Sequence, residues 1–87
     1  MMQTVFLSTF TRQLKEFVRD DRRIALKIFE LIADIEREPT SGIGKPEPLK
    51  YGLSGYWSRR ISGEHRLVYR IDEDSILFVS CQGHYTL

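Results

Sequence analysis

The chain has 87 residues, of which 41% are hydrophobic and 29% are charged, and its formal net charge is +1. This length suits one folded domain over residues 1–87, and there is neither a run of about 18 apolar residues for a membrane span nor a secretion leader. A single cysteine, Cys81, cannot form an internal disulfide, so we expect a protein of the reducing cytoplasm. The two histidines have no ligand spacing and no glycine-rich phosphate loop is present, so we expect no metal and no cofactor.

The first forty residues predict a strand followed by two amphipathic helices. Residues 4–7 are typical of a strand, and Ser8 is a candidate cap for a helix that ends near Asp20 or Asp21. One of these aspartates can also cap a second helix, which Pro39 stops. Apolar residues recur at helical spacing along this second helix: Ile24, Ile28, Leu31, Ile32 and Ile35, with Phe29 at the edge. Charged residues on the outer faces are expected to be solvated: Arg22, Arg23, Lys27, Glu30 and Asp34.

The second half of the chain predicts a loop and then a set of strands. Residues 40–48 are rich in Gly and Pro and predict a loop, and turn signals separate four strand-like segments: 49–51, 56–61, 65–71 and 75–82. Short turns between the last three indicate an antiparallel meander. The last segment is apolar on both faces, so we expect it to be the central, twice-covered strand. Strand, helix, helix and then strands indicate an α+β domain with the helices packed on one sheet face and the other face open.

Positive charge is concentrated in residues 45–70. This window holds six basic and two acidic residues, a net charge of +4, whereas the rest of the chain carries −3. Aromatic residues are interleaved with these cations: Tyr51, Tyr56, Trp57 and Tyr69. Cations bind phosphates and aromatic rings stack on bases, so an open sheet face with both indicates a surface for single-stranded nucleic acid. A solvated basic face on an ordinary sheet is the alternative interpretation.

The turn between residues 61 and 65 decides which arginine joins the open face. With an even-numbered loop, Arg59 lies opposite Val68 and shares its face with Trp57, Arg66 and Arg70. With an odd-numbered loop or a bulge, Arg60 takes that place instead. Alternation along the strand leaves both possibilities open.

The stretch from Gly44 to Tyr69, GKPEPLKYGLSGYWSRRISGEHRLVY, together with the pair His84 and Tyr85, closely resembles the YoeB/Txe toxins of the RelE/ParE superfamily. The match runs from residue 44 to residue 85 almost without a gap, and residues 86–87 extend beyond the pair at which the family usually stops. The resemblance implies a RelE/ParE-like fold and a bacterial type II toxin. It implies an endoribonuclease, an mRNA interferase, that cleaves mRNA in the ribosomal A site without a metal.

The resemblance also implies partners for the protein. These are mRNA on the ribosome, a YefM/Axe-type antitoxin, and a second copy of the chain in a homodimer. Operator DNA would be bound only through the toxin–antitoxin complex, and no membrane is involved. Two other functions stay open: a ParE-like toxin that binds without cleaving, and a corepressor that acts only with its antitoxin.

Four residues form the candidate catalytic set on this resemblance, and together they favour the nuclease. Glu47 stands between two prolines, the second of which favours extended backbone at the residue before it, and Glu47 is the candidate base for the 2′-OH. His84 is the candidate acid because imidazole titrates near neutral pH, and Arg66 is the candidate phosphate clamp. Tyr85 is expected to stack on a base or to orient the phosphate. The plainer interpretations are a solvated loop glutamate, a frayed histidine and simple packing of the C-terminal segment.

Further residues are assigned to RNA binding, to the turn and to the core. RNA binding is expected of Lys45, Lys50, Trp57, Arg59 and Arg60, with Trp57 divided between base stacking and the core. His65 is expected to serve the hairpin turn rather than catalysis. Core positions are expected at Leu67, Val68 and Cys81.

Overall fold

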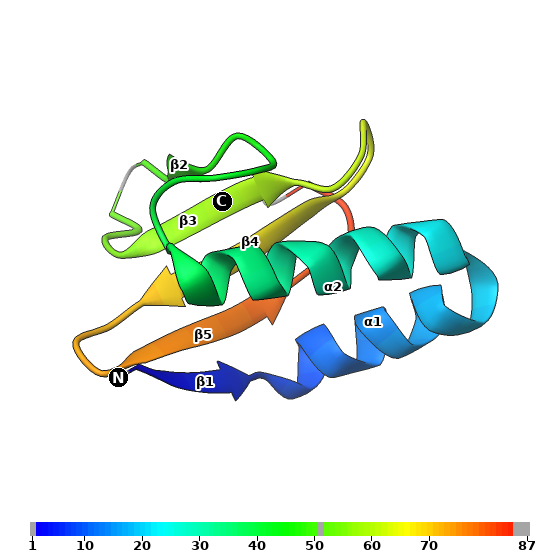
Figure 1. Ribbon diagram of the computed structural model, residues 1–87, viewed down its shortest axis with the longest axis horizontal. Coiled ribbons are helices and arrows are strands. Elements are labelled where there is room, and N and C mark those ends of the chain that lie inside the picture. Colours follow the sequence, from blue (N-terminus) through cyan, green and yellow to red (C-terminus); the bar gives the residue numbers. More distant parts are fainter. Residues whose placement is uncertain (1, 51, 85–87) are drawn as a thin grey trace.

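The computed structural model describes residues 2–50 and 52–84, and Figure 1 shows two helices lying across one face of a five-stranded sheet. Strand β1 (Gln3–Phe6) is followed by helices α1 (Ser8–Asp20) and α2 (Arg22–Arg37). The remaining strands are β2 (Glu47–Pro48), β3 (Tyr56–Arg60), β4 (Arg66–Ile71) and β5 (Ser75–Ser80). Their order is β1-β5-β4-β3-β2; β1 pairs with β5 in parallel and the other pairs are antiparallel. The predicted α+β fold is confirmed.

The prediction that residues 75–82 form the central strand of the sheet is wrong. The middle of the sheet is β4, because β1 adds outside β5 on one side while β3 and β2 add on the other. Coverage of β5 is also unequal: Ile76 and Phe78 on the helix side are buried, whereas Leu77 and Val79 are only half-buried. The strand therefore packs firmly on one face only.

The first strand after the loop lies earlier than predicted. It is formed by Glu47 and Pro48, which pair with residues of β3, and not by residues 49–51. Proline is accepted here because β2 is an edge strand, where one missing N–H leaves no ladder partner unsatisfied. Of the predicted segment, Leu49 still donates its N–H to Tyr56, and Tyr51 lies outside the described residues.

The two helices form a hairpin with an almost direct connection. Asp21 caps α2, because its carboxylate accepts a hydrogen bond from the N–H of Ile24 at 3.3 Å. Ser8 is the first residue of α1 and not its cap; Leu7 occupies the cap position and offers no side-chain bond. The second helix ends at Arg37, shortly before Pro39, as predicted. Within the described ranges, neither helix is long and apolar enough to cross a membrane.

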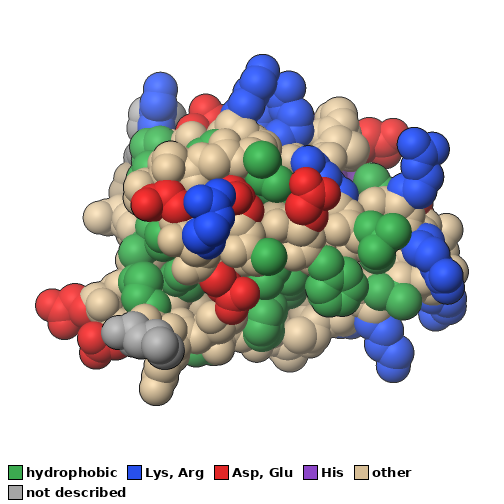
Figure 2. All heavy atoms as spheres, in the orientation of Figure 1, with side chains coloured by type: hydrophobic (Ala, Val, Ile, Leu, Met, Phe, Trp, Pro, Cys, Tyr) green, Lys and Arg blue, Asp and Glu red, His purple; other side chains and the backbone are tan. Residues whose placement is uncertain are grey.

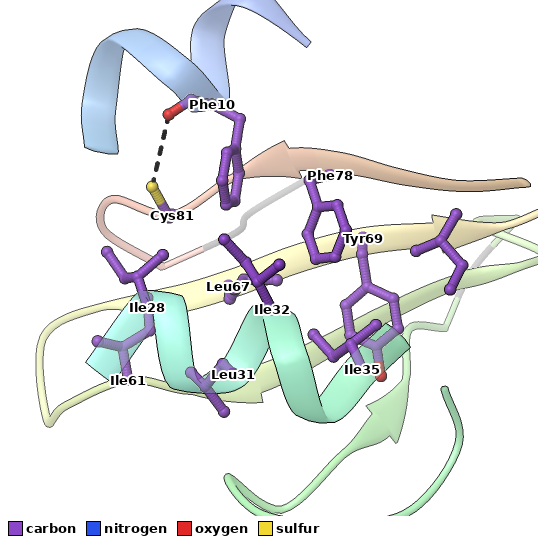
Figure 3. Close-up of a cluster of buried hydrophobic side chains, with 11 residues drawn as sticks. Phe10, Ile28, Leu31, Ile32, Ile35, Ile61, Leu67, Tyr69, Phe78 and Cys81 are labelled. Carbon is purple, nitrogen blue, oxygen red and sulfur yellow. Dashed lines mark hydrogen bonds between the residues drawn. The ribbon is translucent and has the colours of Figure 1, made fainter. Parts of the chain in front are cut away.

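The core fills the space between the helices and the sheet, as Figure 3 shows. Its buried members from both helices and from β4 and β5 include Phe10, Ile28, Leu31, Ile35, Tyr69 and Phe78. The rings of Phe10 and Phe78 lie 5.4 Å apart between centroids, a separation typical of favourable aromatic pairs. The three predicted core positions are all buried: Leu67, Val68 and Cys81.

Charge is distributed unevenly over the helix-covered side. Figure 2 shows Lys and Arg side chains gathered at the end where α1 meets α2, and acidic side chains beside the turn between β4 and β5. The positive charge of the folded protein is therefore not confined to residues 45–70, which the sequence singles out.

Candidate active site

The turn between β3 and β4 decides which face each arginine occupies. Ile61 and His65 close this turn, since the N–H of Ile61 donates to the carbonyl of His65 at 3.0 Å, and three residues lie between them. The loop is therefore odd-numbered, and Arg60 lies directly opposite Arg66. Of the two possibilities that alternation leaves open, the structure selects the one that puts Arg60 on the open face and turns Arg59 toward the helices.

Arg59 is completely buried, so the prediction that it binds RNA is wrong. Its side chain forms an ion pair with Asp34 of α2, and its Nε donates to the hydroxyl of Tyr69 at 3.2 Å. The remaining donors reach backbone carbonyls of the loop after α2: Glu38, Ser41 and Ile43. All five guanidinium N–H groups thus have acceptors inside the protein, and none is left for a phosphate. Asp34, expected on the solvated face of its helix, is instead largely covered.

Trp57 also lies on the helix side. It stands opposite Tyr69 in the β3–β4 ladder and packs, half-buried, against the hydrophobic core. Side chains two residues apart in a strand share a face, so Trp57 faces the same way as Arg59 and away from Arg60. The core interpretation therefore holds for Trp57, and it is not part of the open sheet face.

The buried arginine holds the loop that leads to Glu47. Three carbonyls of this loop accept from Arg59, and the carbonyl of Gly44 accepts from the N–H of Arg60 at 2.7 Å. Gly44 has a positive φ of 79°, and a Cβ there would lie 2.9 Å from a methyl group of Leu31. Only glycine fits this close approach without strain. The loop is thereby fixed three residues before Glu47.

Glu47, Arg66 and Ser58 meet on the open face of the sheet. Pairing of β2 with β3 places Glu47 opposite Ser58, and Nη1 of Arg66 donates to Oε1 of Glu47 at 3.1 Å and to the Ser58 hydroxyl at 3.4 Å. The carboxylate side chain is 59% exposed and the arginine side chain 24% exposed. A carboxylate and a guanidinium that belong to the predicted catalytic set are thus in direct contact.

The C-terminal segment returns to this arginine. Gly83 accepts a hydrogen bond from the backbone N–H of Arg66 at 3.0 Å, and its own N–H donates to Nδ1 of His65 at 2.9 Å. His84 is the next residue and is exposed. The structure therefore brings two of the four predicted catalytic residues, Glu47 and Arg66, into contact, and it anchors the residue before His84 on the backbone of Arg66. The fourth, Tyr85, lies outside the described residues.

Other predicted cations surround this end of the sheet. Lys45, Lys50 and Arg60 are all exposed. Lys45 has a positive φ of 52°, a backbone conformation uncommon outside glycine. Together they give the approach to Glu47 a positive character, which attracts polyanions.

Several contacts in this part of the fold are not predicted from the sequence. Ser58 contacts Arg66, and Gln13 of α1 accepts the N–H of Cys81 at 2.7 Å, which anchors the start of the C-terminal segment. Arg70 lies over the ring of Tyr56, with its Cζ 5.6 Å from the ring centroid. Such contacts join residues far apart in the chain, so only the fold identifies them.

The side chains that could ligate a metal stay apart in the part of the chain that the structure describes. There, no group of three His, Cys, Asp or Glu side chains is placed to hold an ion. Burial raises the pKa of the Cys81 thiol to about 12, so this thiol stays protonated at neutral pH. Burial likewise raises the pKa of Tyr69, whose hydroxyl donates to the carbonyl of Pro39 at 2.6 Å.

Comparison with known proteins gives a consistent result. Residues 6–85 match the family described as the YoeB-like toxin of bacterial type II toxin–antitoxin systems. The chain is 60% identical over 65 residues to Toxin YoeB of Escherichia coli strain K12, covering 75% of this chain and 77% of that protein. It is 46% identical over 84 residues to Toxin YoeB of Streptomyces coelicolor, covering 97% and 100%.

Solved structures agree with the sequence matches. A YoeB/ParE toxin from Agrobacterium tumefaciens superimposes with a TM-score of 0.88 at 41% identity, over 97% of this chain and 100% of that one. A YoeB dimer from Staphylococcus aureus gives 0.86 at 44% identity, over 97% and 98%. The toxin in a heterotetrameric YoeB–YefM complex from the same organism gives 0.83 at 43%, over 98% and 99%.

Proposed function

The chain belongs to the YoeB family of toxins of bacterial type II toxin–antitoxin systems, and from this premise we propose that it is an endoribonuclease that cleaves mRNA in the ribosomal A site. The observation that carries the proposal is the contact of Glu47 with Arg66, next to a backbone anchor that holds the residue before His84. A carboxylate, a guanidinium and an imidazole at one end of a basic sheet face supply a base, a charge stabiliser and an acid.

The proposed reaction is an in-line displacement within the RNA strand. Glu47 takes the proton of the 2′-OH, the 2′-oxygen bonds to phosphorus, and the bond from phosphorus to the 5′-oxygen breaks. His84, starting as imidazolium, gives its proton to that departing oxygen. The products are a 2′,3′-cyclic phosphate and a 5′-hydroxyl.

Arg66 would serve both the base and the phosphate. Within the described residues both of its side-chain contacts use Nη1, which leaves Nη2 and Nε to donate to a phosphoryl oxygen. A planar guanidinium can hold a carboxylate and a phosphate at the same time because its donors form a rigid fork. Negative charge on the phosphorane would develop beside this cation. Lys45, Lys50 and Arg60 would bind the flanking phosphates.

Dependence on the ribosome follows from the openness of this site. Glu47 and His84 are both exposed, so the protein by itself offers little to hold a flexible RNA strand in line for attack. Orientation of reactants contributes much of the rate of such reactions. We therefore infer that the ribosome supplies this orientation to mRNA in its A site.

The proposed partners include a second copy of the chain and an antitoxin of the YefM/Axe type. Support comes from the Staphylococcus aureus relatives, of which one is described as a dimer and another as a complex with YefM. We infer that the antitoxin neutralises the toxin in the cytoplasm and that the complex binds operator DNA.

The decisive experiment is cleavage of mRNA on programmed ribosomes by purified protein. Wild type is expected to cut the A-site codon, and His84→Ala to cut at least ~10²-fold more slowly, because one proton transfer is removed. Gln82→Ala is the matched control, since this residue is exposed in the same segment and has no part in the reaction. Growth arrest by wild type without any RNA cleavage would favour a binding toxin and contradict the proposal. Cleavage of free mRNA at the same rate as ribosome-bound mRNA would contradict the dependence on the ribosome.

A further inference from the structure

His65 lies where three parts of the fold meet. Its ring contacts Phe17 of α1 edge-on, with centroids 5.0 Å apart and an interplanar angle of 71°. Its Nδ1 accepts the N–H of Gly83 in the C-terminal segment. It directly precedes Arg66, the first residue of β4. One side chain thus links a helix, the β3–β4 hairpin and the segment that carries His84.

The backbone of His65 is itself fixed by the turn. Its N–H donates to the hydroxyl of Ser62 at 3.2 Å, and its carbonyl accepts the N–H groups of Ile61 and Ser62. These three bonds close the hairpin, which is the turn role predicted for His65. With the backbone held by the turn and the ring braced by Phe17, Nδ1 has a defined place to receive a donor.

Two hydrogen bonds hold Gly83 against this corner. Its N–H reaches Nδ1 of His65 and its carbonyl reaches the N–H of Arg66. The residue has a positive φ of 71°, so the chain turns sharply just before His84. Because Nδ1 accepts, this nitrogen carries no proton, and the bond depends on its lone pair.

We propose that His65 is a positioning residue which, through Gly83, holds His84 beside Arg66 for proton transfer to the departing oxygen. The inference rests on the proposed function, in which His84 is the acid. An exposed histidine that lies beyond the last strand has many accessible positions, and a displacement of about 1 Å can cost ~10²-fold in rate. The bond from Gly83 to His65 removes this freedom one residue before the imidazole.

Two substitutions of His65 distinguish the contribution of its hydrogen-bond acceptor from that of the packing of its ring. His65→Leu keeps apolar bulk against Phe17 but has no acceptor. His65→Asn loses the ring but retains an acceptor, because its Oδ1 is as many bonds from the backbone as Nδ1. Glu64→Ala is the control, as it alters an exposed side chain in the same turn. Thermal unfolding of all variants establishes that each is folded at the assay temperature.

The kinetic test is single-turnover cleavage on programmed ribosomes with two substrates, one natural and one with sulfur in place of the departing 5′-oxygen. Sulfur leaves without an acid. His65→Leu is expected to be slowed roughly tenfold or more on the natural substrate, a part of the ~10²–10⁴ of a proton transfer. On the sulfur substrate it should approach wild type. His65→Asn should recover most of the rate on the natural substrate, and Glu64→Ala should match wild type.

A second measurement reports on the contact without activity. Amide hydrogen exchange at Gly83 in the free protein should be faster in His65→Leu than in wild type and slow again in His65→Asn. Unchanged exchange in His65→Leu would overturn the inference, and so would an equal loss on both substrates or an asparagine variant as slow as the leucine variant.

The outcomes for His84→Ala distinguish the two proposals. If sulfur rescues His84→Ala but not His65→Leu, the assignment of the acid stands and the positioning role of His65 is wrong. If sulfur fails to rescue His84→Ala, the acid is not His84. The proposed mechanism then fails, and the role of His65 in it fails too, even if Gly83 exchange shows that the contact exists.

Discussion

The guanidinium of Arg59 and the carboxylate of Asp34 form an ion pair that joins β3 to α2 across 25 positions of the sequence. The same guanidinium binds three carbonyls of the loop that leads to Glu47. Arg59, within the most basic part of the chain, thus stabilises the fold, while its neighbour Arg60 faces solvent. The division between these two residues leads to the first three predictions.

Substitution of Arg59 is expected to destabilise the protein strongly. Arg59→Leu should lower the free energy of unfolding by about 3–5 kcal/mol, because it leaves Asp34 without its buried partner. Arg59→Lys should recover only part of this, since an ammonium cannot direct donors to five acceptors. Urea denaturation measures both values, with Arg60→Leu as the matched control. A loss no larger than that of Arg60→Leu would contradict the assignment.

Asp34 is expected to contribute to the free energy of unfolding at neutral pH and to lose this contribution at acid pH. Hydrogen bonds from Arg37 and then Arg59 lower the pKa of this carboxyl from 3.8 to about 2. A carboxylate favoured by folding stabilises the protein above its unfolded pKa, and this contribution is lost as the pH falls from 3.8 to about 2. The difference in unfolding free energy between wild type and Asp34→Asn should therefore narrow across this window. A difference that stays constant from pH 6 to the acid limit would show that Asp34 is not the group responsible.

Arg60 is expected to bind RNA phosphate without contributing to the fold. Arg60→Ala should weaken binding to single-stranded RNA and reduce the slope of log affinity against log salt by about 0.7, the value for one phosphate contact on a single strand. Arg22→Ala, which removes an exposed charge at the start of α2, should leave the slope unchanged. Equal effects of the two substitutions would indicate general attraction by net charge and no contact at Arg60.

The roles of Glu47, Arg66 and His84 can be separated with the sulfur substrate. Sulfur should restore most of the rate lost in His84→Ala and little of that lost in Glu47→Ala, because only the acid becomes unnecessary. Arg66→Ala should stay slow with either substrate, since charge develops on the phosphate regardless of the leaving group. Single-turnover rates on programmed ribosomes provide the test. Equal rescue of Glu47→Ala and His84→Ala would contradict the assignment of Glu47 as the base and His84 as the acid. A product with a 5′-phosphate would contradict the proposed reaction, which leaves a 5′-hydroxyl.

A cognate antitoxin is expected to inhibit by covering or displacing this site. A basic, partly apolar surface suits an acidic segment that folds on binding. Contacts with residues 45–66, or displacement of His84, should therefore appear as changes in amide exchange of Arg66 and Gly83 on addition of the antitoxin. Protection confined to the outer faces of α1 and α2, with unchanged RNA cleavage, would refute steric inhibition.

The sequence alone was sufficient for the class of fold and for most of its elements. Helical spacing of apolar residues, the cap at Asp21 and the stop at Pro39 are local signals, and local signals determine helices. The pattern shared with YoeB toxins also pointed to the family and to Glu47, Arg66 and His84 as candidates. The sequence did not predict how these residues are arranged. The contact between Glu47 and Arg66, and the hydrogen bond between Gly83 and Arg66, are known only from the fold.

Tertiary structure alone decided which cations lie on the open sheet face and which contacts hold the loop before Glu47 in place. The side-chain period of a strand is two, so a turn of three residues instead of four exchanges Arg59 with Arg60 between core and solvent. Asp34 could not be recognised as the partner of Arg59, because a charge on a helix is normally solvated and nothing nearby in the sequence marks it as covered. The contact of His65 with Gly83 could not be predicted either. It forms because β5 returns the chain to the β3–β4 turn, and no local sequence pattern encodes this return.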